Sequence, residues 1–441
     1  MKRFYSYLVK YPIHVYLIVL FIMICTRLSL TYFSPSGHIR MPEWNFAFET
    51  LGRDDKFSAE AAFKIRAHKP GYIFGYAPVL ISLVSAEVLE SVGVCRASSP
   101  AACEPRMFQI AIIIAVIGLF GLLYFSIPRE QDRTLALILY GIFLLGVPMN
   151  KAIESGNIDL LASLTIGIAM VLLRAIIDKK GNTLIASIFM GLLIGFAANI
   201  KAFIILLGAV PLVLSLNNPT ALISFVIGFS ATALWPHLYG IQSGIFDIFF
   251  AAAGFVKDYG VGLSLHPVTQ INYGNNALFP YVSNVLSWIH LSKLAPRIHS
   301  GLTAIVGAIA MVILYIKPFY DEKLFTRKAI AYCKKHLSVF SAFSFSLVLF
   351  TLAYMAISTL MTWSYDYRML YSLPLLFLLI ATPGTNKTKL LLHLSILFFL
   401  IKCLWIPKDR FMTLFLYIHM YFLLRTSVSL WKHRQMPHRF V

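Results

Sequence analysis

A succession of apolar segments, each about as long as a bilayer-spanning helix, most constrains how this chain can fold. A window of about 19 residues finds them near 13–32, 73–91, 107–126, 135–149, 158–174, 183–199, 202–216, 220–238, 300–316, 338–360, 370–383, 390–406 and 411–425. A helix of about 20 apolar residues spans roughly 30 Å of hydrocarbon. Only 13% of the residues are charged, whereas soluble proteins average about 25%. The sequence therefore predicts an all-α, polytopic integral membrane protein.

Lys and Arg outnumber Asp and Glu by 38 to 19, which gives a net charge of +19. In a membrane protein this excess indicates cytoplasmic loops and contact with anionic lipid headgroups. The sequence has no soluble basic domain that could bind nucleic acid, so nucleic acid is not expected as a partner. The basic clusters precede the first apolar run, follow the fifth, fill 317–335 and end the chain. Both termini are thus predicted to be cytoplasmic, with the first run as a signal anchor.

Two cytoplasmic termini require an even number of crossings, so we expect about 12 transmembrane helices. The run at 73–91 holds Gly, Pro and two Glu residues, and we expect it to re-enter or lie in the interface. Residues 1–441 then form a single domain without repeats, with outer loops at 33–72 and 237–300. The loop between Cys95 and Cys103 falls outside, where a disulfide is chemically possible, although spacing alone leaves the pairing open.

The first outer loop concentrates acidic residues in a chain that is otherwise poor in them. Five of the 19 acids lie between positions 43 and 60: Glu43, Glu49, Asp54, Asp55 and Glu60. A carboxylate at a membrane interface can act as a general base. The alternative is an amphipathic juxtamembrane helix whose aromatic residues lie among the headgroups while its acids face water.

Further polar residues occur where apolar runs begin or end on the same side. Glu154, Asn157 and Asp159 cluster before and within the run at 158–174, and Lys201 follows the run at 183–199. Ionisable groups at such depth are candidates for function, and a lipid phosphate would neutralise Lys201. Alternatively, Lys201 pairs with Asp159 or extends to the interface.

The stretch 362–368 combines aromatic and charged residues in Trp363, Tyr365, Asp366 and Arg368. A guanidinium offers a planar donor fork suited to phosphate, although an interfacial aromatic belt with a snorkelling arginine has the same composition. The histidines of the outer loops lack the spacing of metal ligands. An acid with cations on one side suits transfer of a group from a phosphate-bearing lipid to a hydroxyl.

Four segments resemble the polyprenyl-phosphate-dependent glycosyltransferases of the GT-C class, and among them glycosyltransferase family 87, the bacterial polyprenyl-phosphomannose-dependent mannosyltransferases. Gly156-Asn-Ile-Asp-Leu-Leu resembles the family's Gly-Gln/Asn-x-Asn-Leu-Leu, and the segment from Met190 to Lys201 resembles Gly-Leu-x-x-Gly-x-Ala-x-x-x-Lys. Tyr76-Ala-Pro resembles Tyr-Pro-Pro, and Thr362-Trp-Ser-Tyr-Asp-Tyr resembles Ser-Trp-x-His-Tyr. The order and spacing hold over roughly residues 10–380.

The resemblance implies a bacterial inner-membrane enzyme with a large first periplasmic loop that bears juxtamembrane helices. Such an enzyme moves a sugar, a mannose-like hexose or a pentose, from a polyprenyl-phosphate donor to a hydroxyl of a lipid-linked or surface glycan on the periplasmic side, with inversion. Lys201 matches the family's lysine, so the resemblance implies it as a donor-phosphate ligand, and the guanidinium of Arg368 is the second candidate by its chemistry. The leaving group carries one phosphate, so no metal or other cofactor is required.

The family's catalytic Asp-Phe pair has no direct counterpart here. Glu43-Trp44 has the most similar residue types, an acid followed by an aromatic residue, and His38-Ile39 stands at the distance from the first helix at which the family has its pair. Asp54-Asp55 resembles the paired acids of other GT-C enzymes. Glu43 is therefore the first candidate for the base, with Asp54 and Asp55 as the second. Two other functions fit the same composition: an O-antigen or polysaccharide polymerase or ligase that uses the 237–300 loop, and a lipid or solute transporter or flippase.

Overall fold

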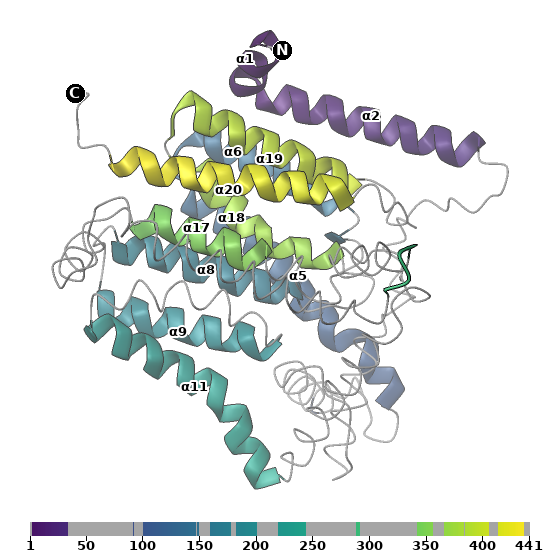
Figure 1. The fold of residues 1–441 in the computed structure, drawn as a ribbon. Helices are drawn as coiled ribbons and strands as arrows, with labels where there is room; N and C mark the ends of the chain where they lie inside the picture. Colours follow the sequence, from purple (N-terminus) through teal and green to yellow (C-terminus); the bar gives the residue numbers. More distant parts are fainter. Residues whose placement is uncertain are drawn as a thin grey trace.

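The computed structural model describes residues 2–33, 91, 100–146, 148–149, 159–177, 182–200, 219–243, 288–291, 342–355, 366–382, 384–404 and 413–435. The regular structure within these residues is helical, and they contain no strand. Long helices lie side by side in a layered bundle (Figure 1). The all-α prediction is confirmed for this part of the chain.

Most of the described helices coincide with predicted apolar runs. They are α2 (Pro12–Phe33), α5 (Pro100–Ser126), α6 (Glu130–Leu144), α8 (Asp159–Ile177), α9 (Thr183–Ile200), α11 (Pro219–Ser243), α17 (Ala342–Met355), α19 (Asn386–Leu404) and α20 (Thr413–Gln435). Apart from Ser91, the runs at 73–91, 202–216 and 300–316 lie outside the described residues.

The chain begins with a short helix that the apolar runs did not predict, α1 (Lys2–Lys10). Its axis is bent by 107° from that of α2. Pro12 opens α2, and a proline disfavours helical backbone at the residue before it. The break between the two helices therefore falls at Tyr11.

Several predicted boundaries differ from the observed ones; α5 begins at Pro100 rather than near 107, and α6 begins at Glu130 rather than near 135. The run at 370–383 divides into the 3-10 helix η5 (Asp366–Ser372) and α18 (Leu373–Ile380), whose first turn holds Pro374. Proline is tolerated only in the first turn of a helix, so α18 cannot extend further toward the N-terminus. Helix α20 continues past the apolar run to Gln435, and α11 continues past His237 to Ser243.

Two helical hairpins are antiparallel. Helices α5 and α6 are joined by a tight turn, and the Tyr140 hydroxyl donates a 2.8 Å hydrogen bond to the Val116 carbonyl oxygen. Between α19 and α20, Thr388 and Ser429 lie 2.8 Å apart, hydroxyl to hydroxyl. Ser395 Oγ lies 3.0 Å from Nδ1 of His419. Residue numbers rise along α19 as they fall along α20.

Helices α9 and α11 instead run parallel and in very close contact. A Cβ placed on Gly191 would collide with the Phe225 carbonyl oxygen, and one on Gly195 would come within 2.7 Å of the Phe229 carbonyl oxygen. Moving four residues along α9, from Gly191 to Gly195, thus moves the contact four residues in the same direction along α11, from Phe225 to Phe229. The end of α9 and the start of α11 consequently lie at opposite ends of this pair.

Helix α8 lies inside the bundle, where it contacts α5, α9, α17, α18 and η5. It is also the one described helix that is long and apolar enough to cross a membrane, over Asp159–Ile176; the bent pair α1 and α2 would add a second such span. The outer faces of other helices expose large apolar side chains, among them Phe21 on α2, Phe125 on α5 and Ile223 on α11.

Candidate functional site

The two ends of the described chain lie at the same end of the bundle. The Tyr16 hydroxyl and His393 Nδ1, 2.6 Å apart, join the first half of α2 to the first half of α19. The Thr388–Ser429 contact places the last turns of α20 beside the start of α19. In Figure 1 the N label stands at the top centre, above the start of α2, and the C label at the upper left, beyond the end of α20.

Helices α6 and α8 can be oriented in the same frame. The rings of Phe143 and Phe399 lie 5.0 Å apart, and a Cβ on Gly146 would be 3.3 Å from Cys403 Cβ, so α6 runs in the direction of α19. Gly118 of α5 faces Leu164 of α8, and Leu122 faces Gly167. Helix α8 therefore runs parallel to α5 and ends where α6 begins.

These contacts bring many basic residues together at one end of the bundle, which we call the basic end. Its described side chains come from α1, the α5–α6 turn, the first turn of α6, α8, α19 and α20. They are Lys10, Arg129, Arg133, Arg174, Lys387, Lys389 and Arg425. Two acids, Glu130 and Asp132, lie there as well.

Several residues singled out in the sequence lie at the opposite end. Asp159 begins α8, and Ile200, which immediately precedes Lys201, ends α9. The chain passes from the end of α18 to the start of α19 at the basic end. The 3-10 helix η5 precedes α18, so it lies toward the opposite end, and Asp366 and Arg368 belong to its first turn. Because η5 packs against α8, the fold brings these two predicted segments together.

Asp159 is fully buried at the N-terminus of α8. The partial positive charge of a helix N-terminus stabilises a carboxylate in the first turn. The Ser163 hydroxyl, also buried, donates a 3.1 Å hydrogen bond to the Asp159 carbonyl oxygen. A buried acid thus lies inside the bundle at the N-terminal end of the apolar helix α8.

The second half of η5 is anchored in the core, which fixes the position of its first half. Met369, Leu370, Tyr371 and Ser372 are all buried. The Ser372 hydroxyl donates a 2.7 Å hydrogen bond to the Met369 carbonyl oxygen. Arg368 directly precedes this buried stretch, so its backbone is held where η5 packs on α8.

The other predicted site residues lie outside the described residues. They are Glu43, Asp54, Asp55, Tyr76, Glu154, Asn157, Lys201, Trp363 and Tyr365, together with Cys95 of the predicted disulfide. Cys103 belongs to α5. Within the described part of the chain, no group of three or more His, Cys, Asp or Glu side chains could hold a metal ion.

The sequence interpretation missed two buried histidines, because it considered only those of the outer loops. His393 pairs with Tyr16, and His419 Nδ1 lies 3.0 Å from the Ser395 carbonyl oxygen. Both histidines fall inside predicted apolar runs, at 390–406 and 411–425. An ionisable residue inside such a run was the signal that could have identified them.

Comparisons of the chain with protein-family models, with curated proteins and with solved structures find no match.

Proposed function

We propose that this chain is a polytopic membrane glycosyltransferase of GT-C type that transfers a sugar from a polyprenyl phosphate to a glycan hydroxyl. One observation carries the proposal. Asp159 and η5, with Asp366 and Arg368, lie at the end of the bundle opposite the basic end, and α9 ends there immediately before Lys201. The backbone segment that carries Arg368, a candidate phosphate ligand, thus shares one end of the bundle with a buried acid.

Separate observations support the proposal that the helical bundle lies in a bilayer. Large apolar side chains are exposed on α2, α5, α9 and α11, with Phe125 85% and Phe21 67% exposed, and extensive exposed apolar surface is typical of contact with a membrane or a partner protein. The parallel orientation of α9 and α11 favours one further crossing between them, where the sequence predicts the span at 202–216. About 12 spans, with the basic end in the cytoplasm, fit the positive-inside rule.

In the proposed reaction a carboxylate of the first outer loop, Glu43 or the Asp54–Asp55 pair, removes the proton from the acceptor hydroxyl. The acceptor oxygen attacks the anomeric carbon from the face opposite the phosphate, which inverts the configuration. The bond between the anomeric carbon and the phosphate oxygen breaks, and polyprenyl phosphate leaves with the electron pair. Lys201 and Arg368 stabilise its developing charge.

The test is release of polyprenyl phosphate from a panel of polyprenyl-phosphate sugars, with purified full-length protein and a glycan acceptor. Glu43→Gln or Asp55→Asn is expected to lower kcat about 100-fold or more, whereas Lys201→Ala mainly raises the KM for the donor. Glu130→Gln, which removes an exposed acid at the basic end, is the matched control and retains activity. Normal transfer by all three site variants contradicts the site, and no release from any donor contradicts the activity.

A further inference from the structure

The basic end has tyrosine rings lying against its basic side chains. Lys10 Nζ is 5.1 Å from the centroid of the Tyr11 ring. Arg133 Cζ lies 4.9 Å from the Tyr124 ring centroid, and Arg425 Cζ lies 5.8 Å from that of Tyr421. All three distances are within the roughly 6 Å range of a cation–π interaction. We call them the aromatic–cation pairs.

The rings of these pairs are accessible from outside the bundle. Tyr11, Tyr124 and Tyr421 are 39%, 45% and 53% exposed. Tyrosine has an apolar ring and a polar hydroxyl, and it is enriched at the level of lipid headgroups. The pairs come from three separate places, the α1–α2 junction, the α5–α6 hairpin and α20, so they form several contact points rather than one pocket.

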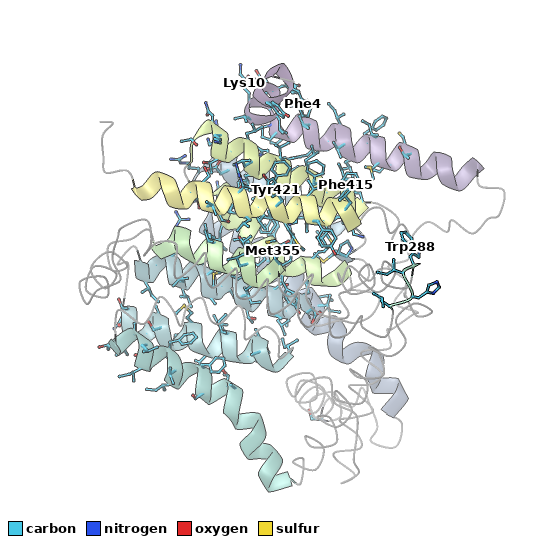
Figure 2. The ribbon with its side chains drawn as sticks, in the orientation of Figure 1. Phe4, Lys10, Trp288, Met355, Phe415 and Tyr421 are labelled. Carbon is cyan, nitrogen blue, oxygen red and sulfur yellow. The ribbon has the colours of Figure 1, made fainter. Side chains whose placement is uncertain are left out.

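Helix α1 adds an aromatic face at the same end. Because α1 is bent by 107° from α2, it lies along the bilayer surface when α2 crosses the bilayer. Phe4, Tyr7 and Tyr11 share one face by their spacing, and all three are exposed, while Leu8 is buried. Figure 2 shows Phe4 and Lys10 on this helix, above the bundle.

We propose that the basic end binds acidic phospholipids through the aromatic–cation pairs. The Tyr11 and Tyr124 rings lie at headgroup level and hold their cations toward lipid phosphates, whereas Tyr421 lies deeper along α20 and orients Arg425 from below. A cation held in this way loses less rotamer entropy on binding than a free Lys or Arg side chain would. The charge of this end complements an anionic leaflet, despite Glu130 and Asp132 in the turn beside Arg133. The proposal rests on the bilayer placement but is independent of sugar transfer.

The experiment measures the melting temperature of the detergent-solubilised full-length chain during titration with phosphatidylglycerol. Phosphatidylcholine and inorganic phosphate serve as the comparison ligands. One variant combines Lys10→Gln, Arg133→Gln and Arg425→Gln, which neutralises the three paired cations. The charge-matched control combines Arg129→Gln, Lys387→Gln and Lys389→Gln, which removes three exposed cations of the same end that no described ring covers.

Phosphatidylglycerol is expected to raise the melting temperature of the parent chain, whereas phosphatidylcholine and inorganic phosphate leave it nearly unchanged. Both variants lose the general attraction of three surface charges, which is about fivefold for each cation near the headgroups. The paired-cation variant should need several times more phosphatidylglycerol than the control variant for half of the effect. Equal shifts in both variants, or none in either, would overturn the proposal while leaving the transfer assay unaffected.

Discussion

At the scale of single residues, buried polar side chains connect helices whose other contacts are apolar. Tyr16 joins α2 to α19, and the Thr351 and Ser427 hydroxyls, 3.0 Å apart, join α17 to α20. A buried polar group without a partner costs free energy. Contacts of this kind therefore select one arrangement of helices over others that would bury the same apolar area.

Tyr16→Phe tests how much such a connection contributes. The substitution leaves the buried His393 Nδ1 without its 2.6 Å partner, and we expect a loss of about 0.5–2 kcal/mol in stability. The control is Tyr140→Phe, since the hydroxyl of Tyr140 donates to a helix carbonyl that keeps its bond within α5. Thermal unfolding in detergent compares the two variants. An equal or larger loss for Tyr140→Phe would contradict the role assigned to His393.

At the scale of helices, the close approach of α9 and α11 depends on the absence of side chains at three positions. Gly191 and Gly195 are spaced four apart on α9, and Gly228 faces them from α11. Small residues with this spacing let two helix backbones approach each other in a membrane. The Thr232 hydroxyl adds a 2.9 Å hydrogen bond to the Leu192 carbonyl oxygen across the same contact.

Gly228→Ala is expected to separate this pair, because the added Cβ would collide with the backbone of Ile188. Overpacking of this kind costs about 1–3 kcal/mol. Gly141→Ala in α6 is the matched control, since a Cβ there has no atom within 4 Å among the described residues. It should leave stability unchanged or raise it by up to about 1 kcal/mol. A lower melting temperature for Gly141→Ala than for Gly228→Ala would refute the packing argument.

At the scale of the whole molecule, the exposed cations of the described residues lie at one end of the bundle. Exposed cations such as Lys387 gather at the basic end, while Trp288 lies toward the other end, at the right in Figure 2. Under the proposed topology the basic end faces the cytoplasm. The proposed donor site then faces the periplasm, where the proposed lipid-linked donor would meet its glycan acceptor.

Cysteine labelling in intact cells tests this orientation. A membrane-impermeant maleimide should label Trp288→Cys in intact cells, and Lys387→Cys only after the membrane is permeabilised. Both residues are exposed, so burial does not protect either position, and the labelling of the parent chain's own cysteines is subtracted. The reverse pattern would place the proposed donor site in the cytoplasm and would rule out the periplasmic reaction.

Several elements could be predicted because their signals are local. The apolar runs locate α2, α8 and α9 to within about three residues, because a helix forms its backbone hydrogen bonds within the segment itself and so lets a long apolar run be buried. Other features depend on contacts between distant residues. The division of 370–383 into η5 and α18, and the pairing of His393 with Tyr16, are examples. The catalytic candidate Glu43 stays a prediction.

By itself the sequence determined the class of fold, the position of most described helices and the excess of positive charge, since these follow from hydropathy and composition along short windows. Only the tertiary structure decided that α9 and α11 run parallel, that α8, which begins with Asp159, packs against η5, and that cations from five separate helices share one end. The physical reason is that apolar periodicity specifies which segments become helices. Which helices touch, and in which direction, depends on shape and hydrogen bonding between residues far apart in the chain.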